Sequence, residues 1–239
     1  IAQCLVGSEM CIRDSINFTP DFPRVADIAS QIWHRAGHDD VDGVISVDPV
    51  FLQRLLKVAG PVTLSDGTVM SGDNAEQRIL NQIYIDTDTQ AEQTDFFTMA
   101  ASEVFAHVLK NVDGKNQQLV QTFQKSVSDG HLYVWSAHED EQRRISGTTI
   151  AGELQSKPAH SVTGVYFNDA TMGKMDWYLK REVTSTYDKT YPSGAKQYTV
   201  HIKLTNTADA AEVNAAPDLL RGYDHNGNPR TGEIETVLY

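Results

Sequence analysis

The chain has 239 residues, of which 40% are hydrophobic, and a formal net charge of −12 at pH 7. A chain of this length can bury a hydrophobic core in one large domain or in two small ones. Its acidic balance disfavours nonspecific binding to nucleic acid or to anionic lipid, so we expect neither as a partner.

The first fifteen residues differ in character from the rest. Residues 5–15, LVGSEMCIRDS, resemble a translated sequencing adapter and not natural protein. We therefore set residues 1–15 apart as an adapter artefact and expect the natural sequence to start near Ile16. Both cysteines, Cys4 and Cys11, lie in this segment, so the remaining sequence offers no disulfide, thiolate metal site or cysteine nucleophile.

The next part of the chain predicts helices around a small sheet. Apolar residues spaced three to four apart in Asp21–Ala36 predict an amphipathic helix. The β-branched run 41–47 predicts a strand that leads directly into a helix at Asp48-Pro49, because Asp is a good N-cap and Pro suits the first helical turn. That helix should end at Gly60.

A tight hairpin around residues 65–67 and four further helices are predicted next. Two of the helices begin with the spacing of a capping box, in which two side chains satisfy free amides at a helix start. The pairs are Asp73 with Glu76 and Thr89 with Glu92. The predicted helices are 73–85, 89–110, 117–127 and 138–144, with an apolar strand at 131–135.

Beyond about residue 160, the hydrophobic period changes from helical to alternating. Strands are predicted at 161–167, 177–187, 196–204 and from 236 onward, with a hairpin turn at 192–194. The stretch 205–219, rich in Ala, Asn and Asp, is predicted to be a long loop. We therefore expect an α/β core over residues 16–159 and an antiparallel β-rich region over residues 160–239.

Two sets of residues resemble metal ligands, and each also has a plain structural interpretation. Asp224, Asn226, Asn228 and Glu235 fit four positions of a calcium loop, but Pro229 replaces its glycine, and ordinary turn chemistry explains the segment as well.

His34 and His38 have the spacing of two metal ligands on one helix, yet Gly37 lies between them and indicates a surface pair. Two polar clusters, 138–141 and 168–176, are interpreted as an exposed helix start and a polar loop. The sequence lacks the GxSxG, GxxxxGK[ST] and GxGxxG signatures, so no cofactor is assigned.

Five stretches carry a resemblance to a known family. They read NFTPDFP at 17–23, VDGVISVDP at 41–49, AGPV at 59–62, YVWSAH at 133–138 and GVYFND at 164–169. Together they resemble the bacterial domain-of-unknown-function family 4012, common in actinobacteria. The resemblance implies an extracytoplasmic protein anchored to the cell membrane by an N-terminal helix absent from this sequence. The family's upstream Glu-Leu-Arg and Gly-Gly motif is also absent here.

A more distant similarity is to the LytR-CpsA-Psr family, which transfers glycopolymers from polyprenyl-pyrophosphate carriers to the cell wall. Segments 41–47, 49–59 and 60–62 have the order and spacing of that family's core, which implies three layers with helices around a small sheet.

The LytR-CpsA-Psr family clamps the pyrophosphate with arginines, which are suited to phosphate oxygens. Here Gln82, Tyr84 and Gln93 occupy that neighbourhood, with Arg78 the nearby arginine, so the clamp is not reproduced. Arg24 is one cation that could approach a phosphate, and a surface helix residue is the other interpretation.

We expect an envelope protein that binds a wall glycopolymer or its polyprenyl-phosphate-linked precursor, with Asp21, Arg24 and Asp48 as binding residues. One alternative is a glycopolymer transferase, with Asp21 and Asp48 as metal or base ligands and Arg24 on the pyrophosphate. Another is an interaction module that binds an envelope protein through the C-terminal sheet. Convergent charges would favour the transferase, a pocket without convergent charges the binding module, and an exposed apolar patch the interaction module.

Overall fold

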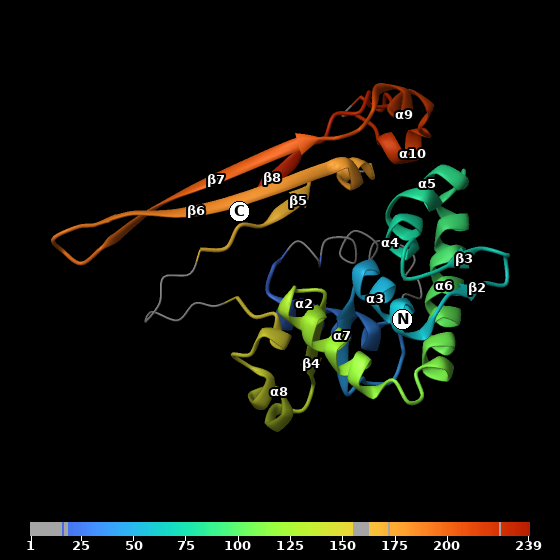
Figure 1. Cartoon of the computed structure of the whole chain (residues 1–239), viewed down its shortest axis with the longest axis horizontal. Coiled ribbons are helices and arrows are strands. Elements are labelled where there is room, and N and C mark those ends of the chain that lie inside the picture. Colours follow the sequence, from blue (N-terminus) through green and yellow to red (C-terminus); the bar gives the residue numbers. More distant parts are fainter. Residues whose placement is uncertain (1–15, 17–18, 155–162, 172, 225) are drawn as a thin grey trace. The chain divides into compact units, whose positions relative to one another are not determined.

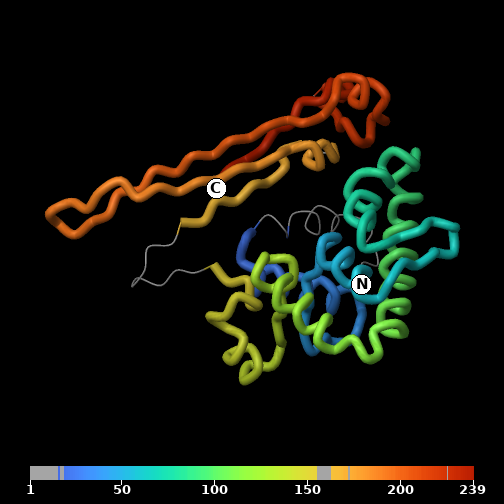
Figure 2. The backbone as a smooth tube through the Cα atoms, in the orientation of Figure 1, coloured from blue at the N-terminus to red at the C-terminus, as the bar shows by residue number. Residues whose placement is uncertain are grey.

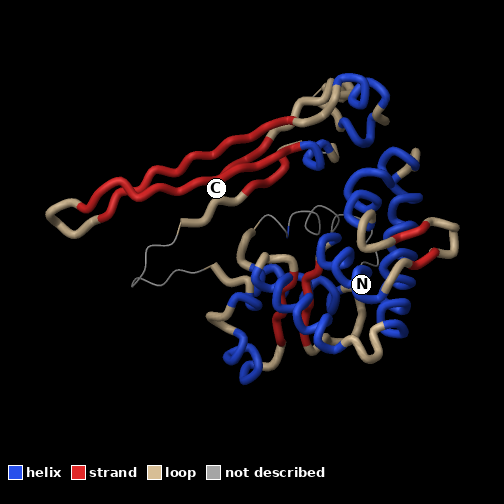
Figure 3. The backbone as a smooth tube through the Cα atoms, viewed as in Figure 1, coloured by secondary structure: helices blue, strands red, loops and turns tan. Residues whose placement is uncertain are grey.

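The computed structural model describes residue 16 and residues 19–154, 163–171, 173–224 and 226–239. The chain divides into two units (Figure 1). Unit 1 contains the described residues up to Ile83, together with Thr89–Tyr166 and Tyr239, and unit 2 contains Tyr84–Asp88 and Phe167–Leu238. Helices and small antiparallel sheets occur in both, which confirms the predicted α/β class (Figure 3).

Unit 1 is built around one short ladder. Strand β1 (Gly43–Val47) pairs antiparallel with β4 (Leu132–Ser136), with Val47 opposite Leu132. Helices α2 (Phe22–Arg35) and α7 (Asn116–Ser128) contact this sheet, and α3 (Pro49–Ala59) packs on α7 (Figure 2). The helices therefore cover the small sheet, as the sequence predicts.

Helix α3 supplies much of the core of unit 1. It is amphipathic, and the side chains Phe51, Leu52, Leu55 and Leu56 are buried on one face. Its start is fixed by Asp48, whose Oδ1 accepts a hydrogen bond from the Phe51 N–H at 2.9 Å, as the sequence predicts. Burial of these apolar groups and the cap both favour this helix.

The other elements of unit 1 surround this core. They are β2 (Val62–Thr63), β3 (Val69–Met70), α4 (Ala75–Gln77), the π-helical turn η2 (Arg78–Gln82), α5 (Ile83–Asp86, which continues into unit 2), α6 (Gln90–Asn111), α8 (Glu139–Ile145) and η3 (Thr149–Ala151). The β2–β3 pair confirms the predicted hairpin. No helix in the described ranges is long and apolar enough to cross a bilayer.

One of the two predicted capping boxes is wrong. Thr89 and Glu92 form theirs at the start of α6. Asp73 and Glu76 do not, because the Asp73 N–H donates to Ser71 Oγ at 3.2 Å and the helix begins later, at Ala75. The Glu76 N–H donates instead to Gln53 Oε1, at 2.9 Å.

Unit 2 contains a long two-stranded ribbon. Strand β6 (Leu179–Thr190) pairs with β7 (Lys196–Asn206), and the turn between them includes Gly194 at φ 84°. A second pair joins β5 (Phe167–Asp169) to β8 (Thr236–Leu238). A small core of Met175, Val213 and Leu220 closes one end of the unit, with Tyr84 and Tyr178 packed against it.

Three predictions for this region need correction. The strand predicted at 161–167 begins only at Phe167, although Tyr166 exchanges two backbone hydrogen bonds with Tyr239. Residues 161–162 lie outside the described residues. Residues 175–178 form the 3-10 turn η4 (Met175–Tyr178) before β6. The predicted loop 205–219 contains α9 (Ala210–Ala215) and the start of α10 (Asp218–Arg221), the former held by a capping box of Asp209 and Glu212.

Candidate functional site

The three predicted binding residues lie at the starts of two helices in unit 1. Asp21 precedes α2, Arg24 lies in its first turn, and Asp48 caps α3. Asp21 Oδ1 accepts a hydrogen bond from the Leu154 N–H at 3.2 Å. Arg24 is exposed and makes no hydrogen bond or ion pair with another described residue. Within the described ranges, no such contact joins any two of the three.

Asp48 instead meets a histidine that the sequence analysis had not singled out. Its Oδ2 lies 2.6 Å from His131 Nδ1. Val47 and Leu132 form the last rung of the β1–β4 ladder, so the residue after β1 and the residue before β4 come to the same edge. One carboxylate therefore caps a helix and orients an imidazole.

Tyr133 connects this edge to the start of α2. Its ring centroid is 5.6 Å from that of Phe22, and the Phe22 N–H donates to the Gly152 carbonyl at 3.0 Å. Burial raises the pKa of the Tyr133 phenol, and coulombic interactions with Tyr166 and Asp48 raise it further. We call Phe22, Asp48, His131 and Tyr133 the Tyr133 cluster.

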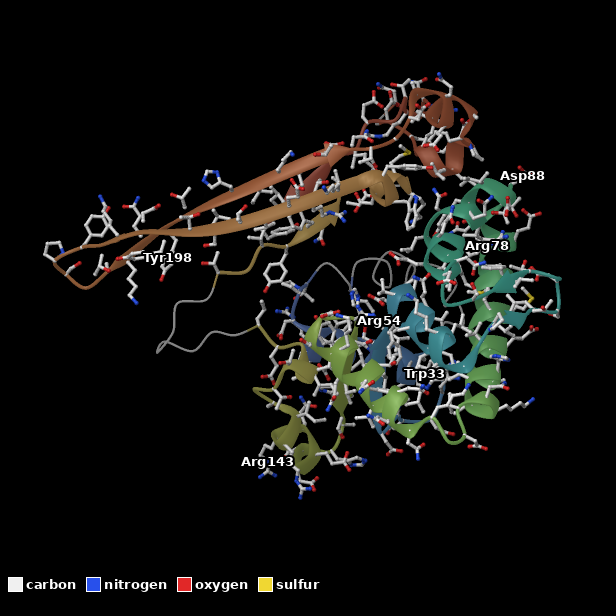
Figure 4. All side chains as sticks on the ribbon, in the orientation of Figure 1. Trp33, Arg54, Arg78, Asp88, Arg143 and Tyr198 are labelled. Atoms are coloured by element: carbon white, nitrogen blue, oxygen red, sulfur yellow. The ribbon has the colours of Figure 1, made fainter. Side chains whose placement is uncertain are left out.

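Arg54 fixes the turn that carries His131. From α3, its Nη1 donates to the buried Ser126 hydroxyl at 3.1 Å and its Nη2 lies 2.6 Å from Asp129 Oδ2 (Figure 4). The His131 N–H donates to the Ser126 carbonyl at 2.8 Å. These contacts hold the end of α7 against α3 and so determine where the imidazole lies.

Asp129 gives this turn a defined pH dependence. Hydrogen bonds from Lys125 and then Arg54 hold the pKa of the Asp129 carboxyl below its ordinary value of 3.8. A carboxyl with a lowered folded-state pKa stabilises the fold above the unfolded-state value, and that contribution disappears as the pH falls through the folded-state pKa.

We therefore expect Asp129→Asn to lower the melting temperature at pH 7, and this effect to diminish as the pH falls toward about 2, through the lowered folded-state pKa of Asp129. Calorimetric melts across this range measure the difference. Asp113→Asn, at an exposed carboxyl without an ion pair to another described residue, is the control. A deficit for Asp129→Asn that did not change with pH would contradict the assignment.

The other candidate residues have structural partners. Asp224 Oδ1 accepts from the N–H groups of Asn226 and Asn228, both at 2.8 Å, which closes a turn and lowers the pKa of Asp224. Glu235 pairs with Arg230 at 2.9 Å. Among the residues that the structure describes, no cluster of His, Cys, Asp or Glu is arranged to hold a metal ion.

The two histidines and the described residues of the two polar clusters contact nearby side chains and do not form a shared site. His34 binds Asp40 at 2.7 Å, whereas His38 stacks on Trp33. His138 Nε2 lies 3.1 Å from Asp42 Oδ1, just before α8. In segment 168–176, Asp169 closes a turn at Thr171 and Asp176 pairs with Arg181. Burial raises the pKa of Asp176.

Comparison with known proteins identifies one family. The family described as a protein of unknown function (DUF4012) matches residues 5–84, a range that begins within the adapter-like segment. No curated protein and no solved structure matches the chain. Residues 5–84 are thus similar to the DUF4012 family, in agreement with the resemblance of the stretches at 17–23, 41–49 and 59–62.

Proposed function

We propose that this chain is part of an extracytoplasmic, membrane-anchored envelope protein that binds a wall glycopolymer or its lipid-linked precursor at the Tyr133 cluster. The family resemblance supports the envelope role. The observation that carries the binding site is that Tyr133 contacts Phe22, next to Asp21, and also lies within the electrostatic influence of Asp48. The starts of α2 and α3 thus share one aromatic neighbour.

The groups in this cluster suit a ligand rich in hydroxyls. With Asp48 Oδ2 on Nδ1 of His131, Nε2 of the same ring can hydrogen-bond a ligand. The Tyr133 hydroxyl can donate or accept, and its ring offers a face for the apolar side of a sugar. Asp48 already binds the Phe51 N–H and His131, so we assign it a positioning role and propose binding without catalysis.

Calorimetric titration with a polyprenyl-pyrophosphate analogue, with and without magnesium, tests this proposal. We expect saturable binding that weakens about tenfold in Arg24→Ala, through loss of a charge-assisted hydrogen bond to phosphate, and also in His131→Gln. Arg35→Ala, at an exposed arginine at the other end of α2, should leave the affinity unchanged. Absence of binding under both conditions, or equal losses in Arg24→Ala and Arg35→Ala, would reject the site.

The two alternatives differ in what supports them. A transferase would need Asp21, Arg24 and Asp48 to act on one substrate, and the described contacts do not join them. A protein-interaction module is favoured by a different observation, the uncovered apolar residues along the β6–β7 ribbon. We keep this second candidate for unit 2.

A further inference from the structure

The β6–β7 ribbon has one apolar face that the described structure leaves open. Register pairs Val183 with Ile202 and Tyr187 with Tyr198, and Val200 lies between them opposite Ser185. Side chains directly opposite each other in an antiparallel pair lie on the same face, as do alternate residues. We call Val183, Tyr187, Tyr198, Val200, Ile202 and Leu204 the apolar face; each is 36% to 52% exposed.

A ribbon of this kind is not expected to stay uncovered. Two strands alone are marginally stable in water, and a partner on the hydrophobic face supplies the missing burial. The six side chains leave roughly 500 Å² uncovered, the size of the functional patches found on monomers. Two such faces packed together would remove about 1,000 Å² from water, the lower limit for a specific interface.

The face is better suited to an interface than the edges are. Lysines occur along both strands, and the pairing shifts at a bulge between Tyr187 and Lys189, two features that discourage edge-to-edge addition. The face itself includes no carboxylate. Two cations share this side of the ribbon: Arg181, which is held by Asp176, and Lys196, which lies beyond Tyr198 at the turn end. Covering the six apolar side chains therefore does not require burial of a charge between them.

Charge within unit 2 indicates which partner and which orientation would fit. The ribbon, residues 179–206, contains five basic residues (Lys or Arg) and two acidic residues (Asp or Glu). The rest of unit 2 contains three basic and ten acidic residues. The ribbon therefore carries +3 and the remainder −7. Helices α9 and α10 follow the Asn206 end of the ribbon, opposite its turn, and Tyr198 lies toward that turn (Figures 1 and 4).

We propose that the occupant of the apolar face is a second copy of this chain, packed face to face and antiparallel about a two-fold axis near Ser185 and Val200. The inference rests on the second candidate function, the interaction module. In this arrangement, the turn end of each ribbon, which carries Lys189 and Lys196 against Asp188 and so a net +1, approaches the acidic remainder of the other unit 2. The six apolar side chains of each copy cover those of its partner.

Sedimentation equilibrium of the full chain between about 1 and 100 µM tests the proposal. We expect a reversible dimer. Val200→Asp should weaken dimerisation at least tenfold, because it places two carboxylates together near the axis. Thr184→Asp adds the same charge to the opposite face of the same ribbon and should leave the dimer unchanged. Circular dichroism of both variants verifies that the ribbon is folded, and Ser185→Arg provides a second disruption of the face.

A wild-type chain that stays monomeric at about 100 µM with a folded ribbon would overturn the proposal. So would a dimer that Val200→Asp and Thr184→Asp weaken equally. A photo-crosslinker at position 200 in producing cells tests the interaction-module candidate separately. An adduct with a different envelope protein would support that candidate and would reject a second copy as the occupant of the apolar face. The glycopolymer assay uses the Tyr133 cluster in unit 1, so its outcome is independent.

Discussion

Replacing Leu56 with Ala should lower the free energy of unfolding of unit 1 by about 2–5 kcal/mol. Leu56 is 1% exposed, on the face of α3 that also buries Phe51 and Leu55. The substitution removes the burial of several methyl and methylene groups and leaves a cavity that the neighbouring helices can close only in part. Urea unfolding followed by circular dichroism measures the loss.

Leu109→Ala is the matched control for this experiment. The same atoms are removed from α6, but Leu109 is 75% exposed, so the change in the free energy of unfolding should stay within about 0.5 kcal/mol. Equal losses in Leu56→Ala and Leu109→Ala would show that α3 is not the centre of the core. A concomitant fall in precursor binding is expected only where the fold itself is lost.

Gly152→Ala should destabilise unit 1 by about 2–4 kcal/mol and also perturb the Tyr133 cluster. Gly152 has φ +59°, where a side chain costs strain, and an added Cβ would lie 2.8 Å from Tyr133 Cδ1 and 2.9 Å from Phe22 Cβ. The Tyr133 ring and the Phe22 side chain would both have to move. The glycine therefore permits the close approach through which the start of α2 meets β4.

Gly114→Ala distinguishes the cost of backbone strain at a positive φ from the cost of the steric clash. Gly114 has φ +74°, but an added Cβ would meet nothing within 4 Å, so only the backbone cost of about 1–2 kcal/mol applies. The extra loss in Gly152→Ala then reports contact with Phe22 and Tyr133. Near-ultraviolet circular dichroism of the tyrosines should change in Gly152→Ala alone, and identical spectra and stabilities for the two variants would contradict the packing described above.

Local signals in the sequence predicted helix starts more reliably than they predicted contacts. Asp48-Pro49 and Thr89 with Glu92 each need only a few adjacent residues, and both caps form. The same rule read at Asp209 and Glu212 would have identified α9, which we had predicted to be loop. At Asp73 the rule failed because the two backbone groups that the box would use have other partners: the Glu76 N–H donates to Gln53 and the Asp73 N–H donates to Ser71 Oγ.

The candidate site depended on information that spacing does not contain. Asp48 and His131 are 83 residues apart and meet only because β1 and β4 pair in one particular register. A shift of one residue would move every side chain of the strand to the other face. His131 and Tyr133 alternate at the start of β4, which marks them as sharing a face, but their partner across the ladder could not be inferred from that pattern.

The alternating pattern of β7 correctly predicted which side chains share a face. It did not predict that this face stays partly exposed. Tyr198, Val200, Ile202 and Leu204 do share one side of the ribbon. Alternation usually indicates a strand with one side against a core. Here these four side chains stay 36% to 48% exposed, and β5 and β8 pair with each other and not with the ribbon.

The division of the chain into two units is discontinuous, and this limits how the protein can be cut. Residues Tyr84–Asp88 belong to unit 2 although unit 1 continues at Thr89, and Tyr84 packs on the Met175, Val213 and Leu220 core. A fragment starting at Phe167 would lack that tyrosine, and one ending at Tyr166 would expose it. Gene truncation at the apparent boundary would therefore separate a core from one of its own side chains, so a fragment meant to carry unit 2 intact has to retain residues 84–88 as well.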